Sequence, residues 1–129
     1  MTAPTVLVVD DEDDLREAMR RMLERRGFAT LTAADPAEAE ALCRDRGRAI
    51  DLLLTDLTLP GASGGELART ATSIRPELRV LYVSGLPKEV AVGQGLVGEE
   101  AALVQKPFTS DRLADAVRQA LGGCSSASS

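Results

Sequence analysis

Residues 6–15 read VLVVDDEDDL, an apolar run followed by five consecutive acids and then a leucine. A short run that is apolar throughout is typical of a β-strand covered on both faces. The residues after the acids repeat at helical spacing, with apolar positions at Leu15, Ala18, Met19, Met22 and Leu23. Five neighbouring acids repel one another, so they either occupy the favourable start of a helix or surround a cation. The stretch therefore predicts a strand, an acidic turn and a helix that Gly27 ends.

The same alternation of apolar run and helical pattern continues along the chain. Further strands are predicted at 28–33, 50–55, 80–83 and 101–104. Asp35-Pro36 and the capping-box sequence Ser63-Gly64-Gly65-Glu66 predict two helix starts. A weaker helix is expected at 87–94, since we expect Gly93 and Gly95 each to cost it about 1 kcal/mol. Five strand–helix units are too few for an eight-stranded barrel and predict an α/β fold, a doubly wound five-stranded parallel sheet.

Composition limits the classes of function. A chain of 129 residues with a net charge of −5 predicts one domain and argues against binding to nucleic acid. The sequence has no signal-peptide pattern and no apolar run long enough to span a membrane. It contains no histidine, which excludes a Ser-His-Asp triad, a histidine–metal site and a phosphohistidine of its own. Two distant cysteines, Cys43 and Cys124, suggest a reducing compartment and a cytoplasmic location. We expect a folded domain over 1–122 and a disordered tail over 123–129.

Polar side chains stand where four of the predicted strands end: Asp10 and Asp11, Asp56, Ser84 and Lys106. Each alone has an ordinary explanation as a helix start, a turn, a loop residue or a surface lysine. The carboxyl ends of parallel strands share one edge of a sheet, so together these residues predict a site. Carboxylates without histidine or cysteine favour Mg²⁺, and a metal, a lysine and a hydroxyl together suit a phosphoryl group.

The segments VLVVDDED, LLLTDLTLPGASGGEL, VLYVSG and VQKPF, in this order and spacing, resemble the receiver domain of two-component response regulators. The resemblance covers about residues 5–121. It implies a flavodoxin-like fold with strand order 2-1-3-4-5 and helices on both faces of the sheet. It also implies that Asp56 takes a phosphoryl group from a partner histidine kinase or phosphotransfer protein, so that the chain is a phosphoacceptor and not an enzyme.

The resemblance further assigns a role to each residue of the site. Asp11 would ligate Mg²⁺ directly and Asp10 through water, together with Asp56 and the backbone carbonyl of Thr58. Ser84, followed by Gly85, and Lys106 would bind phosphoryl oxygens. The bond between Lys106 and Pro107 would be cis. The family usually has an aromatic residue three positions before the lysine, and here that position is Leu103, which puts an aromatic switch at this site in doubt.

Several functions stay open at this level. The last third of the chain most resembles receivers of hybrid histidine kinases, so the chain could relay or store phosphoryl groups, or switch an unidentified downstream protein as a monomer or weak dimer. A Mg²⁺-dependent aspartyl-phosphate phosphatase is a remote alternative, because Thr58 stands where such an enzyme needs a second acid. A flavin site is disfavoured by the acidic run and by the scarcity of aromatic residues.

Overall fold

The structure, a computed structural model, describes residues 3–59 and 62–122 and contains one parallel sheet of five strands. These strands are β1 (Thr5–Val9), β2 (Ala29–Ala33), β3 (Leu52–Asp56), β6 (Arg79–Ser84) and β7 (Ala102–Gln105). Their spatial order is β2-β1-β3-β6-β7, and every neighbouring pair is parallel. Counting only these five gives the predicted order 2-1-3-4-5, so the expected fold is confirmed.

A small feature was not predicted from the sequence. Strands β4 (Thr58–Leu59) and β5 (Ala62–Ser63) pair antiparallel in a separate two-stranded ribbon directly after β3. Two-residue strands leave no periodic pattern in the sequence, because alternation needs at least four residues to be recognisable. The ribbon carries the chain from the end of β3 to the start of the next helix.

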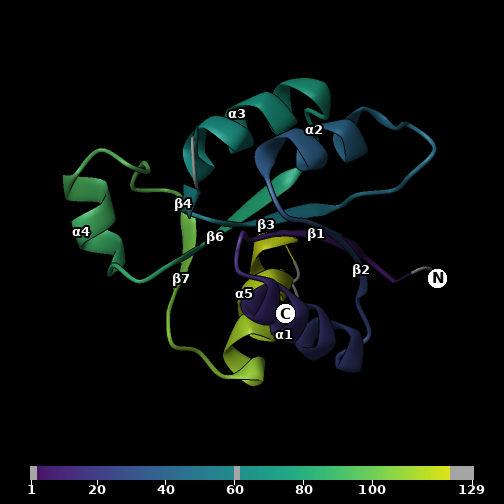
Figure 1. The fold of residues 1–129 in the computed structure, drawn as a ribbon. Helices are drawn as coiled ribbons and strands as arrows, with labels where there is room; N and C mark the ends of the chain where they lie inside the picture. The colour runs from purple at the N-terminus through teal and green to yellow at the C-terminus, as the bar shows by residue number, and fades with distance from the viewer. Residues whose placement is uncertain (1–2, 60–61, 123–129) are drawn as a thin grey trace.

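The described part of the chain forms five helices around the sheet (Figure 1). Helices α1 (Asp13–Arg25) and α5 (Ser110–Ala120) cover one face, while α2 (Pro36–Arg44) and α3 (Gly64–Ile74) cover the other. Helix α4 (Lys88–Gly93) stands to the side of the sheet, next to the β6 and β7 edge. None of the helices among the described residues is long and apolar enough to cross a membrane. The predicted tail over 123–129 lies outside the described residues.

Two hydrophobic cores explain the apolar strands. In β1, Val6 and Val8 pack towards α1 and α5, whereas Leu7 and Val9 pack towards α2 and α3, and all four are 0% exposed. Burying an aliphatic side chain of this size contributes about 1.5–3 kcal/mol. Alternate residues of β1 face opposite cores. Polar residues are therefore tolerated only beyond the end of β1, where the acids begin.

The helix ends follow the sequence signals with one correction. The Asp35 side chain accepts a hydrogen bond from the Glu38 amide, and Ser63 and Glu66 form a reciprocal capping box. Gly27, at φ +94°, ends α1 as predicted. Gly95 was expected to weaken the 87–94 helix, and this was wrong. It lies beyond the end of α4 at φ +75°, where the amides of Gly95 and Leu96 donate to Val92 and Ala91 and so cap the helix.

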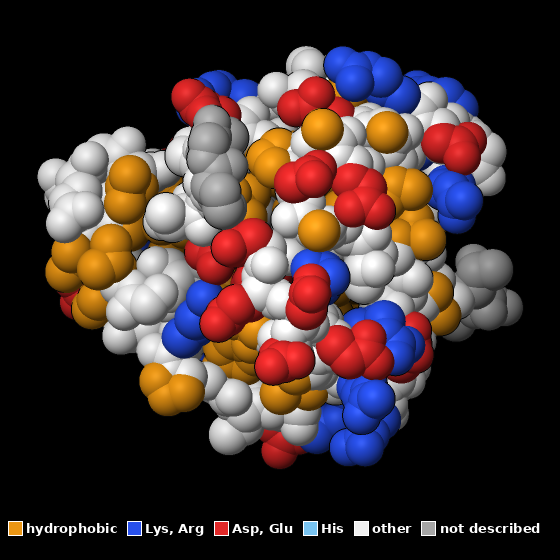
Figure 2. Space-filling model, in the orientation of Figure 1, with side chains coloured by type: hydrophobic (Ala, Val, Ile, Leu, Met, Phe, Trp, Pro, Cys, Tyr) orange, Lys and Arg blue, Asp and Glu red, His pale blue; other side chains and the backbone are white. Residues whose placement is uncertain are grey.

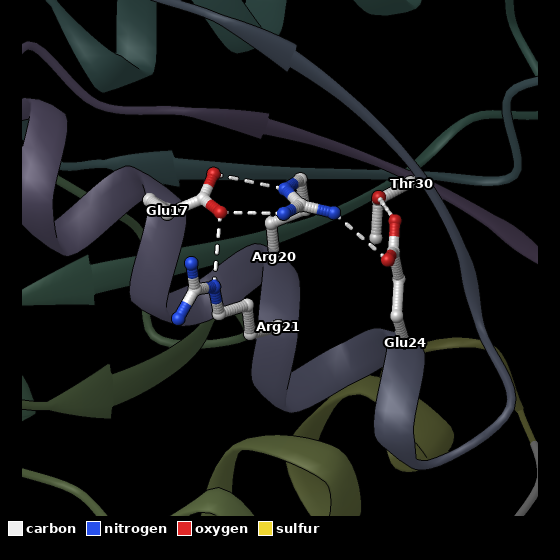
Figure 3. Close-up of polar contacts among 5 residues, drawn as sticks. All are labelled: Glu17, Arg20, Arg21, Glu24 and Thr30. Atoms are coloured by element: carbon white, nitrogen blue, oxygen red, sulfur yellow. Dashed lines mark hydrogen bonds and ion pairs between the residues drawn. The ribbon is translucent and has the colours of Figure 1, made fainter.

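The outer face of α1 carries a chain of charge pairs (Figure 3). Glu17 accepts hydrogen bonds from Arg20 and Arg21, and Arg20 continues to Glu24 at 2.8 Å. Thr30 at the start of β2 donates to Glu24 and ties the helix to the sheet edge. The hydrogen bonds from Arg20 lower the pKa of Glu17 to about 2. These pairs lie on a solvated face of α1, where ion pairs contribute little to stability.

Candidate functional site

The carboxyl ends of the parallel strands bring the predicted residues to one edge of the sheet. Oxygen atoms of Asp10, Asp11 and Asp56 all lie within 4.8 Å of one another. Lys106, directly after β7, places its Nζ 3.0 Å from Asp56 Oδ2. The backbone amide of Lys106 donates to the carbonyl of Ser84 at 2.7 Å, which joins the ends of β6 and β7. Figure 2 shows acidic side chains gathered across this face, with a basic side chain beside them.

Asp10 is the buried member of the acidic group. Asp10 is only 1% exposed, and its Oδ1 accepts a hydrogen bond of 2.8 Å from the Glu12 amide. Its Oδ2 is buried and has no hydrogen-bond partner among the described residues. Burial raises the pKa of Asp10, the neighbouring carboxylates of Asp56 and Asp11 raise it further, and the Glu12 amide opposes this. A buried carboxylate that has an unpartnered oxygen and lies in a group with two further carboxylates is the arrangement that a hard divalent cation would complete.

Asp56 is the member that a reactant can approach. Its Oδ1 accepts a hydrogen bond of 3.0 Å from the Thr58 amide, and its Oδ2 faces Lys106. The side chains of Asp56 and Lys106 are 14% and 30% exposed, so both reach solvent while staying oriented by their partners. The carboxylate is therefore held in place by an amide and an ammonium group and remains accessible.

The other predicted residues lie around this pair. Ser84 is buried, and its hydroxyl accepts a hydrogen bond of 2.9 Å from the Leu86 amide. Gly85 follows it in an exposed turn with open space around its Cα. The peptide bond between Lys106 and Pro107 is cis. Leu103 is half-buried in β7 and is the register partner of Tyr82 in β6.

Two contributors to the site were missed from the sequence. A Cβ on Gly64 would lie 2.4 Å from the backbone oxygen of Asp56, so only glycine lets α3 begin this close to the end of β3. The Gly64 amide also donates to the Leu57 carbonyl at 2.7 Å. Arg16 donates to the backbone carbonyl of Asp10 at 2.7 Å. In the sequence, Gly64 stands within the capping-box pattern and Arg16 within the helical pattern after the acids, and neither pattern indicates the contact.

Comparison with known proteins agrees with this geometry. The family model described as "Response regulator receiver domain" matches residues 6–118. The response regulator receiver protein CpdR of Brucella abortus is 32% identical over 103 residues, which cover 80% of this chain and 84% of CpdR. The sensor kinase CckA of the same organism is 29% identical over 117 residues, 91% of this chain. The chain spans only 12% of that kinase and 25% of a transcriptional regulator that it also matches.

Solved structures lead to the same family. A receiver domain from the hybrid histidine kinase CckA has a TM-score of 0.74 at 31% identity, covering 91% of this chain and 98% of that one. A response regulator from Burkholderia pseudomallei, solved with a phosphorylated aspartic acid, calcium ion and citrate, has a TM-score of 0.76 at 25% identity. That match covers 95% of this chain and 71% of the other. With the strand order, the acidic cluster and the family match in agreement, the chain belongs to the receiver domains of response regulators.

Proposed function

We propose that Asp56 accepts a phosphoryl group from a phosphohistidine of a partner histidine kinase or phosphotransfer protein in a Mg²⁺-dependent reaction. The observation that supports this most strongly is the position of Asp56, whose carboxylate lies beside Lys106 at 3.0 Å and within 4.8 Å of the Asp10 and Asp11 oxygens. Receiver domains are phosphoacceptor signalling domains and interact with such partners and with downstream proteins. They also bind Mg²⁺ at an acidic pocket.

The residues present fit a magnesium ion. Asp10, Asp11 and Asp56 would hold it, with the backbone carbonyl of Thr58 as a further oxygen ligand. The unpartnered Oδ2 of Asp10 supports this assignment, because a buried carboxylate oxygen without a donor is costly unless a cation neutralises it. When bound, the ion would offset the negative charge on the phosphoryl oxygens as the carboxylate approaches them.

In the proposed transfer, a carboxylate oxygen of Asp56 forms a bond to phosphorus while the bond from phosphorus to the imidazole nitrogen breaks. The electron pair leaves with the imidazole, and the product is an aspartyl phosphate. Lys106 would move from its pairing with the free carboxylate to a phosphoryl oxygen. It would thereby stabilise the negative charge on that oxygen during transfer.

Signal transmission would begin at Ser84. Its hydroxyl oxygen accepts a hydrogen bond from the Leu86 amide, and its O–H can donate a hydrogen bond to a phosphoryl oxygen. A shift of Ser84 towards the phosphoryl group would pull the Gly85–Leu86 turn and the start of α4 with it. We propose that this movement, with aliphatic Leu103 in place of an aromatic, alters the surface offered to a downstream protein.

A relay role is the second candidate. The similarity to CckA, a sensor kinase that carries a receiver, favours a domain that passes its phosphoryl group on or stores it. The remote phosphatase alternative needs a second acid at position 58. That residue is Thr58, whose backbone amide donates a hydrogen bond to Asp56. We propose that residues 1–122 act as the receiver unit, in the cytoplasm, as a monomer or weak dimer.

Intact-mass spectrometry tests the proposed transfer. Phosphoramidate, whose P–N bond mimics that of phosphohistidine, is added with Mg²⁺ to the wild type and to Asp56→Asn. The wild type should gain about 80 Da, the mass of one phosphoryl group, and the variant should gain nothing. An equal gain in both proteins, or none in the wild type, would contradict the proposal.

A further inference from the structure

Arg16 makes a contact that differs from those of its neighbours on α1. Its Nη1 donates to the backbone carbonyl of Asp10 at 2.7 Å, and its Nη2 pairs with Asp13 Oδ1 at 2.6 Å. The Arg16 side chain is 19% exposed, whereas that of Asp13 is 84% exposed. One guanidinium group therefore joins the end of β1 to the first turn of α1 across the acidic turn.

The other α1 arginines with described partners act differently. Arg20 and Arg21 bond to glutamate side chains on the outer face of the helix (Figure 3). Arg16 is the only α1 arginine, within residues 3–59 and 62–122, with a side chain that donates to a backbone carbonyl. The hydrogen bond from Arg16 to the Asp10 carbonyl fixes the main chain at the turn. A pair of exposed side chains does not fix the main chain in this way.

Asp10 is consequently held from two directions. The Glu12 amide holds its Oδ1 at 2.8 Å, and Arg16 holds its carbonyl oxygen at 2.7 Å. With these two atoms fixed, Oδ2 stays buried, and the Asp10 carboxylate stays within the group that it forms with Asp11 and Asp56. The three carboxylates, with oxygens within 4.8 Å of one another, repel one another, so these two bonds oppose a displacement of the turn away from Asp56.

We infer that Arg16 is a positioning residue for the metal site: its guanidinium holds the turn between β1 and α1 in the conformation that presents Asp10 and Asp11 to a divalent cation. This inference rests on the metal-binding part of the proposed function. It requires arginine, since only a planar fork can donate to a carbonyl and a carboxylate at the same time in fixed geometry. A lysine would keep the charge, but it would have to reach both oxygens from a single nitrogen and without the fixed fork geometry.

Calorimetric titration with Mg²⁺ tests the inference on the wild type, Arg16→Gln, Arg16→Lys and Arg21→Gln. Arg21 is the matched control, an α1 arginine that pairs with Glu17 on the exposed face. Residues that orient metal ligands typically contribute 10–100-fold to affinity, so the Kd of Arg16→Gln should rise by about tenfold or more. Arg16→Lys should show a smaller rise, and Arg21→Gln should keep the wild-type Kd. Circular dichroism at the titration temperature checks that each variant is folded. If Arg16→Gln does not fold, the comparison is made with Arg16→Lys.

Two further readouts separate positioning from a general structural role. In metal-free protein, the Glu12 amide should exchange its hydrogen faster in Arg16→Gln, because the turn that presents Asp10 Oδ1 is released. In phosphorylation by phosphoramidate, the Mg²⁺ concentration at half-maximal rate should rise while the rate at saturating Mg²⁺ stays at the wild-type value. A wild-type Kd in both Arg16 variants, or no Mg²⁺ binding by the wild type, would overturn the inference. Mg²⁺ binding that depends on Arg16 without phosphorylation of Asp56 would contradict the proposed function and leave the inference supported.

Discussion

At the scale of single residues, Asp10 is a buried carboxylate whose charged form is penalised by its loss of solvent. Burial raises its pKa in the folded state above the unfolded value of about 3.9. An acid whose pKa is raised on folding makes its full contribution to stability only below its unfolded pKa. That contribution is lost as the pH rises through its folded pKa. At neutral pH and without metal, the raised pKa of Asp10 therefore lowers the free energy of unfolding relative to an aspartate with an unshifted pKa.

Replacing this carboxylate should stabilise the metal-free protein. In EDTA at neutral pH, urea unfolding should show Asp10→Asn to be more stable than the wild type by about 1–3 kcal/mol, the usual cost of a buried polar atom without a partner. Asp14→Asn makes the same chemical change at an exposed position in the first turn of α1 and should bring no gain. Mg²⁺ should raise the stability of the wild type and not that of Asp10→Asn. If Asp10→Asn were less stable than the wild type, burial and repulsion by Asp11 and Asp56 would not destabilise the Asp10 carboxylate.

Lys106 offers a second test on one side chain. Removing a single positioned donor from a developing negative charge typically slows a reaction by about 100-fold or more. Lys106→Met should therefore lower the rate of phosphorylation by phosphoramidate about 100-fold in a time course followed by mass spectrometry. Lys88→Met, the other lysine of the chain and an exposed one, should react at the wild-type rate. Equal rates for the two variants would show that the 3.0 Å pairing with Asp56 has no role in transfer.

Which site residues could be predicted depended on where they lie along the chain. Asp10, Asp56, Ser84 and Lys106 each end an apolar run, so the topology of a parallel sheet was enough to bring them together. Arg16 and Gly64 act through the backbone oxygens of Asp10 and Asp56. Such contacts depend on the path of a turn over a few ångström, which periodicity and capping signals do not specify.

At the scale of elements, two glycines at helix ends have opposite roles. Gly64 begins α3 against the backbone of Asp56, while a Cβ on Gly93, the last residue of α4, would meet nothing within 4 Å. Gly64→Ala should destabilise the protein by about 1–3 kcal/mol through overpacking. Gly93→Ala should stabilise it by about 0.5–1 kcal/mol through helix propensity. Urea unfolding of both variants checks the pair, and equal effects of the same sign would contradict the described close approach of α3 to β3.

Helix α4 should be the least protected helix. Ala91 is its one buried residue, whereas α3 buries Gly64, Gly65, Leu67, Ala68 and Ala71. Few buried contacts allow local opening at low free energy. Amide hydrogen exchange should therefore be faster over 88–93 than over 64–74, and phosphorylation should change the exchange of residues 85–100. Slow exchange there that phosphorylation leaves unaltered would exclude α4 as the moving element.

The elements also differed in how far the sequence specified them. Strands of four to six apolar residues and helices with capping boxes were predicted, because their patterns repeat over several turns or pleats. The β4–β5 ribbon is too short for any pattern. Gly95 was expected to weaken the 87–94 helix because a glycine that caps a helix and one that weakens it look alike in the sequence and differ in φ, here +75°.

At the scale of the whole molecule, one sheet with two cores fixes the site. Helices on both faces hold the strand order β2-β1-β3-β6-β7, and that order brings β1, β3 and β6 side by side with β7 at the edge. The acids, the hydroxyl and the lysine then meet at a single edge although they are up to 96 residues apart in the sequence, from Asp10 to Lys106. The family membership and the geometry of the site rest on this one arrangement.

Chemical trapping can locate the phosphoryl group that we propose Asp56 accepts. Sodium borohydride reduces an acyl phosphate to an alcohol and so converts a phosphorylated aspartate to homoserine, which peptide mapping by mass spectrometry can locate. After treatment with phosphoramidate and Mg²⁺, we expect homoserine at position 56, and none when either reagent is omitted. Homoserine at another position, or its absence from a protein that has gained the phosphoryl mass, would show that Asp56 is not the acceptor.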